Sequence, residues 1–260
     1  MTGVRYAVDG HVATVTLDRP AVLNAVDAAT HARLREIWTE VEADPDVRVV
    51  VLTGAGDRAF CVGADMSPDG MEKSGLEYWA SLDPDGFGAL SLRTTLDVPV
   101  IARVNGYALG GGMELVLGCD LVVAADHAQF GLTEPRVGRL PLDGGIVQLV
   151  RRIPHPQAMG LLLTGRRAGA AELARMGLVN EVVPAAELDA AVRRWVDDIL
   201  ACSPASLRAI KQVVNRTGHL SAQEARNLRL PAVMAALDSA DAHEGVQAFQ
   251  QKRRPVWTGR

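Results

Sequence analysis

Cysteine is scarce in this 260-residue sequence, and its spacing excludes a disulfide framework. The three cysteines are Cys61, Cys119 and Cys202, an odd number with no Cys-x-x-Cys pair. Scattered thiols of this kind are typical of a reducing compartment, where a buried cysteine packs as a small apolar side chain.

Long apolar runs are also missing. No stretch of about 20 residues, the length that a membrane-spanning helix needs, is apolar throughout. The residues from Met1 to Val15 lack a basic segment followed by an apolar one, so no secretory signal is predicted. We therefore expect a soluble, cytoplasmic protein with no membrane partner.

An excess of positive charge is absent as well. With 27 lysines and arginines against 31 aspartates and glutamates, the formal net charge is −4 at pH 7. Proteins that coat nucleic acids normally carry a basic surface, so no nucleic-acid partner is expected. The histidines show no metal-ligand spacing such as His-Glu-x-x-His, and no metal site is predicted. They are His11, His31, His127, His155, His219 and His243.

What the sequence does contain is, first, an alternation of strand and helix patterns. Residues 4–8 and 12–17 alternate in polarity around an Asp-Gly pair, which predicts a β-hairpin. Asp27 has the position of an N-cap for a helix with apolar residues at every third or fourth place. The β-branched run 47–52 predicts a strand that is buried on both faces.

Two more strand patterns, at residues 98–104 and 121–125, flank a predicted buried helix. The alternation indicates an α/β body over residues 1–185. Residues 186–260 form a predicted helical region, which we expect to dock on the body or on a partner subunit. Its predicted helices cover residues 187–202, 204–217, 221–237 and 241–253.

Two local patterns add detail to this outline. Ser221 with Glu224, and Asp241 with Glu244, have the spacing of capping boxes at helix starts. Residues 66–96 contain several Pro and Asp-Gly breaks, which predict a mobile loop with one short helix over 76–82. The aromatic pair Tyr78 and Trp79 in that helix could line a pocket, but helix packing is the more common use of such a pair.

Two glycine-containing segments, 60–66 and 105–114, each follow a predicted strand. The second contains three consecutive glycines, Gly110 to Gly112, before a helix. Because glycine has no Cβ and a helix start has unpaired N–H groups, such a junction can bring backbone donors to an oxyanion. A tight turn under a closely packed helix explains the same glycines equally well.

Two glutamates lie near the second glycine segment. Glu114 stands in an apolar neighbourhood, where a carboxylate is unfavourable to bury unless it is partnered or protonated. Glu134 follows twenty positions later, and on spacing alone a solvated loop residue is the favoured interpretation. If both line one apolar pocket, their pKa values would move apart and the pair could divide the acid and base roles.

Several of these segments, in consistent order from about residue 4 to 258, resemble the crotonase (enoyl-CoA hydratase/isomerase) superfamily. The segments are Gly63-Ala64-Asp65, Asn105 to Glu114, Ala128 to Gly145, Asp18-Arg19-Pro20 with Leu23-Asn24-Ala25, and Glu244-Gly245 with Ala248-Phe249 and Lys252-Arg253.

The resemblance implies a spiral of ββα units, with a C-terminal helical region that forms trimers and often hexamers. It implies that the N–H groups of Ala64 and Gly111 bind the thioester carbonyl, and that Glu114 and Glu134 hold a water and act as base and acid. An acyl-CoA thioester is the implied substrate; coenzyme A is part of that substrate, and no separate cofactor is expected. The residues implied to contact coenzyme A are Val22, Leu23, Val62, Asp65, Met66, Phe249 and Lys252, the last two often across a subunit boundary.

The sequence departs from the common hydratases at Leu142 and Asp143, where those enzymes tend to carry Gly and Ala. These side chains would change the shape and polarity of the pocket, and a similar aspartate occurs in the carnitinyl-CoA dehydratase-like branch. An N-cap for the helix at 146–152 is the interpretation that we favour for Asp143. The pairs Arg151-Arg152 and Arg166-Arg167 could meet coenzyme A phosphates, although charges at helix ends are common on surfaces.

The two glutamates favour an enoyl-CoA hydratase, a lyase that adds water reversibly across the α,β double bond. The alternatives that use the same oxyanion hole are an enoyl-CoA isomerase, a carnitinyl-CoA dehydratase-like enzyme and a thioester hydrolase. A non-catalytic scaffold or RNA-binding member of the fold is the alternative from another class.

Overall fold

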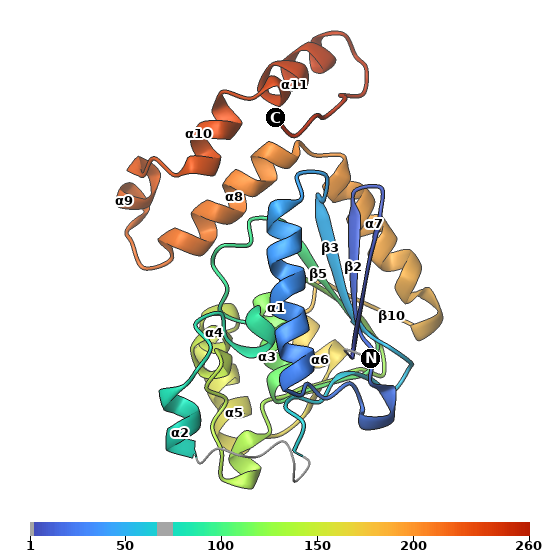
Figure 1. The fold of residues 1–260 in the computed structure, drawn as a ribbon, viewed down its shortest axis with the longest axis vertical. Helices are drawn as coiled ribbons and strands as arrows, with labels where there is room; N and C mark the ends of the chain where they lie inside the picture. Colours follow the sequence, from blue (N-terminus) through green and yellow to red (C-terminus); the bar gives the residue numbers. More distant parts are fainter. Residues whose placement is uncertain (1–2, 67–74) are drawn as a thin grey trace.

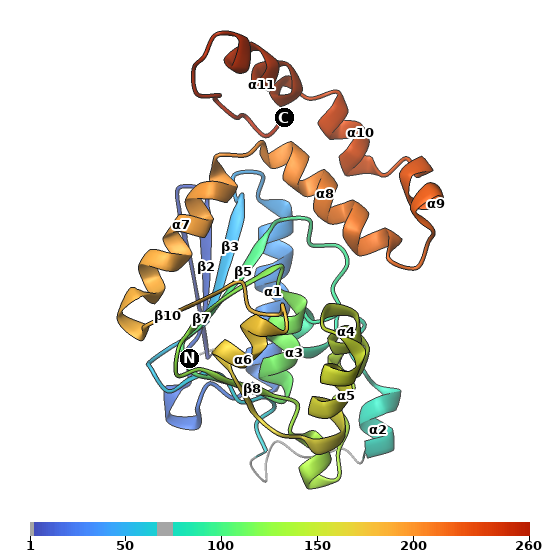
Figure 2. The same ribbon diagram turned by 180° about the vertical axis from the view of Figure 1, so that it is seen from behind.

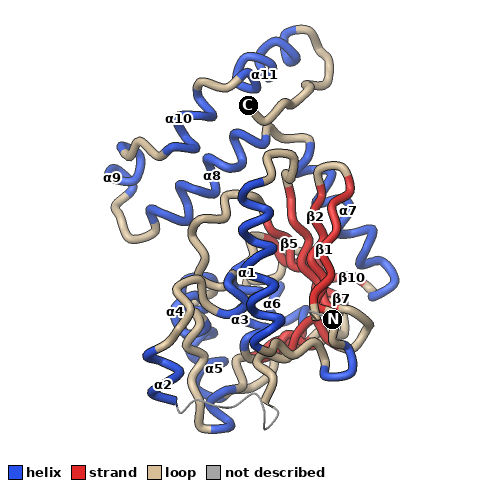
Figure 3. Tube along the Cα trace, in the orientation of Figure 1, coloured by secondary structure: helices blue, strands red, loops and turns tan. Residues whose placement is uncertain are grey.

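The computed structural model describes residues 3–66 and 75–260, and two β-sheets form the centre of this part of the chain (Figure 1). The larger sheet has the strand order β1-β2-β3-β5-β7-β10. The predicted hairpin β1–β2 is its antiparallel edge, and the other strands join in parallel (Figure 3). The strands are β1 (Val4–Asp9), β2 (Val12–Leu17), β3 (Val49–Gly54), β5 (Val100–Val104), β7 (Leu121–Ala125) and β10 (Glu181–Val183).

Strand β3 lies between β2 and β5, and all its residues are buried. Val50 and Leu52 belong to the main apolar core on one face of the sheet, whereas Val49 and Val51 belong to a second apolar cluster on the other face. The prediction of a strand buried on both faces is therefore confirmed, with the strand starting two residues later than expected.

The second sheet consists of short strands that extend the strands of the first. It has the order β4-β6-β8-β9, made of β4 (Ala59–Cys61), β6 (Tyr107–Leu109), β8 (Gln129–Gly131) and β9 (Ala168–Gly169). Strands β5 and β6 lead into helix α3 (Gly111–Gly118), and β7 and β8 lead, through a short 3-10 helix, into helix α4 (Gly145–Arg152). This repetition of two strands and a helix confirms the predicted α/β spiral.

Helix α1 (Ala28–Ala43) packs with its apolar side in the main core. The side chain of Asp27 accepts a hydrogen bond from the N–H of Thr30 at 2.7 Å, so the predicted N-cap is confirmed. The other helical elements of the body are η1 (Pro20–Val22), α2 (Gly75–Ala80), η3 (Phe87–Ala89), η4 (Glu134–Val137), α5 (His155–Thr164), α6 (Ala170–Arg175) and η5 (Ala185–Glu187). Helix α2 matches the short helix predicted at 76–82, while residues 67–74 of the predicted loop lie outside the described residues.

Helices dominate the C-terminal region, as predicted. Helix α7 packs on the sheet through Leu188, Val192 and Val196, and the helices that follow extend beyond the sheet (Figures 1 and 2). They are α7 (Leu188–Leu200), α8 (Pro204–Thr217), α9 (Ala222–Asn227), α10 (Pro231–Leu237) and α11 (Ala240–Gln250). The division of the chain at residue 185 stays a prediction.

One of the two predicted capping boxes is confirmed and the other is wrong. Ser221 and Glu224 exchange side-chain and backbone hydrogen bonds at the start of α9. Helix α11 is capped instead by Ser239. Asp241 is buried and accepts hydrogen bonds from the hydroxyl of Ser203 at 2.9 Å and the N–H of Thr258 at 2.8 Å. Its carboxylate thus links the C-terminal residues to the start of α8, because it accepts hydrogen bonds from both.

Within residues 3–66 and 75–260, the helices are too short or too polar to cross a membrane. Cys61 and Cys119 are buried free thiols, and Cys202 is an exposed one.

Replacing Lys211 on α8 by methionine should destabilise the fold. Lys211 is buried, and its Nζ donates to the carbonyl oxygen of Val98 at 2.6 Å and to Oδ2 of Asp120 at 2.7 Å. Lys211→Met keeps the apolar stem and removes this donor from both oxygens, which should lower the free energy of unfolding in urea by about 1–3 kcal/mol. The same substitution at the exposed Lys252 should change it by less than about 0.5 kcal/mol. Equal effects at both positions would contradict the prediction.

Candidate active site

The first glycine segment is held in place by a single parallel bridge. Val26 donates its N–H to the carbonyl oxygen of Gly63 at 2.9 Å, and its own carbonyl accepts from the N–H of Asp65 at 2.9 Å. The carboxylate of Asp65 forms an ion pair with Arg19 at 2.9 Å. Because the neighbours on both sides make these bonds, the backbone of Ala64 between them is fixed in orientation.

The second glycine segment needs glycine for three separate reasons. Gly110 has φ +55° and ψ −129°, a conformation that L-residues rarely adopt. A Cβ on Gly111 would stand 2.5 Å from the ring of Phe87, and one on Gly112 would stand 2.0 Å from the carbonyl oxygen of Cys61. The interpretation that these glycines allow close packing is therefore confirmed. It is compatible with the second interpretation, in which their backbone N–H groups bind an oxyanion.

The two glycine segments come together where Gly63 meets the start of α3. A Cβ on Gly63 would lie 3.0 Å from the N atom of Gly111. Among the described residues, neither the N–H of Ala64 nor that of Gly111, the first residue of α3, has a backbone acceptor. Unpaired N–H groups at a helix start are suited to bind an oxyanion, so the predicted donor pair has the expected surroundings.

Glu114 lies in the first turn of α3 and is only 3% exposed. Its Oε1 accepts a hydrogen bond from the N–H of Gly145, at the start of α4, at 2.9 Å. Burial, together with the charges of Asp143 and Glu134, raises the pKa of Glu114 to about 8 against the lowering effect of that hydrogen bond. A carboxyl with this pKa keeps its proton at neutral pH.

Glu134 begins η4, and its carboxylate is near enough for its charge to act on Glu114. Its Oε1 would lie 3.3 Å from a Cβ on Gly110, and its Oε2 is buried with no hydrogen-bond partner among the described residues. Burial raises the pKa of this carboxyl as well, and Asp143 adds to the effect. The solvated-loop interpretation of Glu134 is wrong, and the structure brings both predicted glutamates to one site.

The prediction that Asp143 caps a helix is wrong. Helix α4 has Gly144 at its N-cap, with φ +113° and no side-chain cap. The left-handed turn at Gly144 leaves the Asp143 side chain outside the helix start, where its carboxylate accepts a hydrogen bond from the hydroxyl of Tyr78 on α2. Tyr78 therefore points toward the site instead of packing within its helix, whereas Trp79 is 62% exposed.

Three residues near the site were predicted to contact coenzyme A and lie close to the oxyanion segments. Val62, Asp65 and Met66 flank Ala64 on the chain, and Val62 and Asp65 are partly buried while Met66 is exposed. Val22 is 43% exposed at the end of η1, and Leu23 follows it in a left-handed conformation. Leu142 is partly buried beside Asp143. Their roles in binding stay predictions.

Phe249 and Lys252, by contrast, are not brought to this site. Phe249 lies on α11 and is 86% exposed, and Lys252 follows that helix. Figures 1 and 2 place α11 at the opposite end of the molecule from α2, α4 and α5. Within one chain, these two residues do not reach the glutamates.

A hollow of about 570 Å³ lies beside α11, away from the glutamates. Its rim carries Glu244 and Arg253, which bind each other through two hydrogen bonds. Because these two charges already pair with each other, we place the chemistry at the glutamates between α3, η4 and α4.

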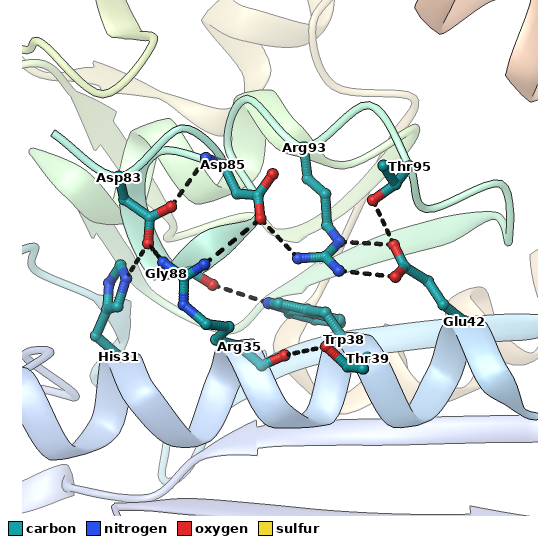
Figure 4. A network of polar contacts seen from close by, with 10 residues as sticks. All are labelled: His31, Arg35, Trp38, Thr39, Glu42, Asp83, Asp85, Gly88, Arg93 and Thr95. Carbon is teal, nitrogen blue, oxygen red and sulfur yellow. Dashed lines mark hydrogen bonds and ion pairs between the residues drawn. The ribbon is translucent and has the colours of Figure 1, made fainter.

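Sequence reasoning missed the support behind the oxyanion segments, which Figure 4 shows. The side chains of α1 bind the segment 83–95 that carries η3. The indole N–H of Trp38 donates to the carbonyl oxygen of Gly88 at 2.8 Å, and His31 contacts Asp83 at 2.6 Å. These bonds hold Phe87, whose ring fills the space next to Gly111.

The same network continues along α1. Arg93 binds Glu42 through two hydrogen bonds of 2.7 and 2.8 Å and binds Asp85 at 2.8 Å (Figure 4). The side chain of Arg93 is only 7% exposed. We expected a mobile loop over 66–96, and for residues 83–95 this expectation is wrong. The only signal in the sequence was the presence of charged residues at Asp83, Asp85 and Arg93, within a segment that we expected to be a loop.

Comparisons with known proteins show the family to which the chain belongs. The family model for enoyl-CoA hydratase/isomerase matches residues 8–260. The chain is 39% identical over 255 residues to a carnitinyl-CoA dehydratase of Proteus mirabilis, covering 96% of both chains, and 39% identical over 256 residues to one of Escherichia coli K12, covering 97% of both.

Solved structures give the same result. An enoyl-CoA hydratase from Mycobacterium tuberculosis superposes with a TM-score of 0.90 at 31% identity, covering 100% of both chains. One from Bacillus anthracis superposes with a TM-score of 0.85 at 33% identity, covering 99% of this chain and 100% of that one. The chain therefore belongs to the enoyl-CoA hydratase/isomerase family of the crotonase superfamily and is similar to its carnitinyl-CoA dehydratase branch.

Proposed function

We propose that this enzyme is an acyl-CoA hydro-lyase, which adds water reversibly across the α,β double bond of an enoyl-CoA thioester. The observation that carries the proposal is the buried Glu114 and the partly buried Glu134 near the N–H groups of Ala64 and Gly111, which have no backbone acceptor among the described residues. Isomerases and hydrolases of the superfamily would use the same oxyanion hole, but two acid–base groups at one site favour the transfer of both protons of a water addition.

In this proposal, the N–H groups of Ala64 and Gly111 bind the thioester carbonyl oxygen. They stabilise the negative charge that the oxygen gains when the enolate forms, and one such donor is worth about 10²–10³ in rate. The position of Gly111 at the start of α3 adds the positive end of the helix dipole. The ring of Phe87 packs next to Gly111, where a Cβ would stand 2.5 Å from it.

The two glutamates would move the protons. One carboxylate removes a proton from water, the resulting hydroxide adds to Cβ, and the other carboxylic acid delivers its proton to Cα. Addition thus consumes one water, and dehydration runs the same steps in reverse. The pair needs one proton between its two carboxyls, and the raised pKa values of both groups support this at neutral pH, since close carboxylates resist double ionisation.

A dehydratase acting on carnitinyl-CoA is the second candidate, and it belongs to the same reaction class. It is supported by the relatives of Proteus mirabilis and Escherichia coli, which carry that name, and by the additional carboxyl of Asp143 at the site. A linear enoyl-CoA without a polar group is the substrate that the first candidate favours. Comparing the turnover of both thioesters separates the candidates.

We also propose that the chain assembles as a homotrimer or hexamer through its C-terminal helices. Several large apolar side chains of these helices are exposed in the single chain: Ile210, Val214, Met234, Leu237, Val246 and Phe249. In such an assembly Phe249 and Lys252 could reach coenzyme A bound to a neighbouring subunit. The free thiols support a cytoplasmic location, and the reaction uses no cofactor other than the coenzyme A of the substrate.

Substituting either glutamate should abolish most of the activity. Glu114→Gln and Glu134→Gln each remove one proton-transfer group, and kcat for hydration, followed by the ultraviolet absorbance of the conjugated thioester, should fall by about 10²–10⁴. Glu172→Gln, which removes a surface carboxylate paired with Arg166, is the matched control and should keep full activity. Full activity in both site variants, or thioester loss with release of free thiol, would contradict a hydro-lyase.

Glu114 should also make stability depend on pH in a defined direction. Its pKa is about 8 in the folded chain, against an ordinary value of 4.5 for a glutamate in water, so the folded state binds the proton more tightly. Its contribution to stability is therefore complete below pH 4.5 and is lost as the pH rises through 8. The free energy of unfolding of the wild type minus that of Glu114→Gln should fall with rising pH in this window, by up to about 1.4 kcal/mol per pH unit. Urea titrations between pH 5 and 8 measure the slope, and a flat or rising difference would refute the assignment.

A further inference from the structure

A buried hydroxyl close to the site has no role in the proposed water addition. Ser91 follows η3 and is only 2% exposed. Its Oγ accepts a hydrogen bond from the N–H of Phe87 at 2.7 Å and donates one to the carbonyl oxygen of Asp143, 52 positions along the chain. One side chain therefore binds the backbone of two distant segments, in a place where a lost partner would leave a buried polar group unpaired.

The two backbone groups that Ser91 binds belong to different parts of the site. Phe87 places its ring against the first residue of α3, which is one of the two proposed oxyanion donors. Asp143 opens the turn before α4, and the N–H of Gly145 in this turn donates to Oε1 of Glu114 at 2.9 Å. The hydroxyl of Ser91 thus joins the oxyanion segment to the turn that holds Glu114.

The turn from Asp143 to Gly145 packs directly on the segment that carries Ser91. A Cβ on Gly86 would collide with the oxygen of Ser91 and stand 3.0 Å from the carbonyl oxygen of Asp143. A Cβ on Gly145 would stand 3.0 Å from Oε1 of Glu114. Because each peptide group is planar, a rotation of the Asp143 carbonyl also changes the direction of the N–H group that follows it. A bond to that carbonyl therefore controls how the turn presents its donors.

The N–H groups of this turn act on the charge of Glu114. Burial, with the charges of Asp143 and Glu134, raises the pKa of Glu114. Hydrogen bonds from the backbone of Gly145 and Asp143 oppose this rise, because they favour the charged carboxylate. On α2, burial raises the pKa of the Tyr78 phenol, and Glu114 is among the carboxyls that raise it further. Two donors that favour the charged form of Glu114 thus lie in the turn that the buried hydroxyl holds.

We propose that Ser91 is a positioning residue of the active site: its hydroxyl fixes the turn before α4, so that the N–H groups of this turn orient the carboxyl of Glu114 for proton transfer. This inference rests on the proposed hydro-lyase function. Ser91 acts through the backbone of Asp143 and Gly145 and needs no contact with the substrate. Without its hydroxyl, the turn loses the bond that fixes its first carbonyl. A displacement of about 1 Å at a reacting group can cost about 10² in rate.

The test compares Ser91→Ala with the wild type by two measurements. Infrared titration of the protonated carboxyl band, assigned to Glu114 by its loss in Glu114→Gln, gives the pKa of this group without substrate. The pKa should rise by at least about 0.5 pH unit in Ser91→Ala, because a hydrogen bond to a charged group is weakened. For the hydration of an enoyl-CoA, kcat should fall at least about tenfold, while KM changes by less than about threefold.

Two further variants show whether Ser91 acts through Glu114. In the Glu114→Gln background, Ser91→Ala should lower the remaining kcat by less than about threefold, since the effects of residues that act as a unit are not additive. Ser91→Cys keeps a side chain of similar size with a weaker donor, so its shifts should have the same direction and be smaller. If Ser91→Ala does not fold, the same measurements on Ser91→Cys decide.

Ser239→Ala is the matched control. Ser239 is also buried, accepts a hydrogen bond from the N–H of Ala242 at 3.2 Å and donates one to the carbonyl oxygen of Ala236 at 2.8 Å. It caps α11, at the opposite end of the molecule from α4 (Figure 1). Its loss should lower the urea midpoint of unfolding as Ser91→Ala does, yet leave the pKa of Glu114 and kcat as they are in the wild type.

The outcomes separate this inference from the proposed function. An unchanged or lower pKa of Glu114 in Ser91→Ala overturns the inference, as does an unchanged kcat. An equal fold-loss of kcat in the wild-type and Glu114→Gln backgrounds overturns it too, because Ser91 would then act by another route. If the wild type hydrates no thioester, the hydro-lyase assignment is wrong, and the infrared titration alone decides whether Ser91 positions Glu114.

Discussion

The close approach of two backbone segments, one after β4 and one at the start of α3, is the constraint on which the rest of the site depends. The Cα of Gly112 stands so near the carbonyl of Cys61 that a single carbon atom would not fit, and Gly63 meets Gly111 in the same way. Because this contact is made by backbone on both sides, it brings N–H groups rather than side chains to the site. The two sheets, the bridge at Val26 and the ring of Phe87 all hold this contact in place.

A second property of the site is that three buried or partly buried carboxyls lie close enough for their charges to interact. Glu114, Glu134 and Asp143 each have a raised pKa because burial disfavours their charged forms. Such groups lower the stability of the fold at neutral pH, yet they supply a proton donor and a proton acceptor in the same place. The opposite arrangement occurs at Asp241, where converging donors lower the pKa and the carboxylate only fastens the end of the chain.

Much of the architecture could be predicted from local sequence patterns, because turns, caps and buried strands depend mainly on residues a few positions apart. The hairpin, the doubly buried β3, the cap at Asp27 and the helical C-terminal region are of this kind. The glutamates and the glycine run were found as well, with the help of the family resemblance. The errors concern contacts between distant parts of the chain: Asp143 binds Tyr78 across 65 positions, and Trp38 binds Gly88 across 50. Rules of periodicity and helix capping concern residues a few positions apart, so they cannot predict these long-range hydrogen bonds.

The bonds between α1 and the segment 83–95 also restrict how the protein can be altered. Several polar groups of this segment bind side chains of α1 (Figure 4). They are the carboxylates of Asp83 and Asp85, the carbonyl of Gly88 and the guanidinium of Arg93. A segment transplanted from a relative would arrive without those partners unless α1 came with it. In a chimera of two relatives, α1 and the segment 83–95 must therefore be exchanged together. Residues that are far from the glutamates in sequence thus have to come from the same parent as the site.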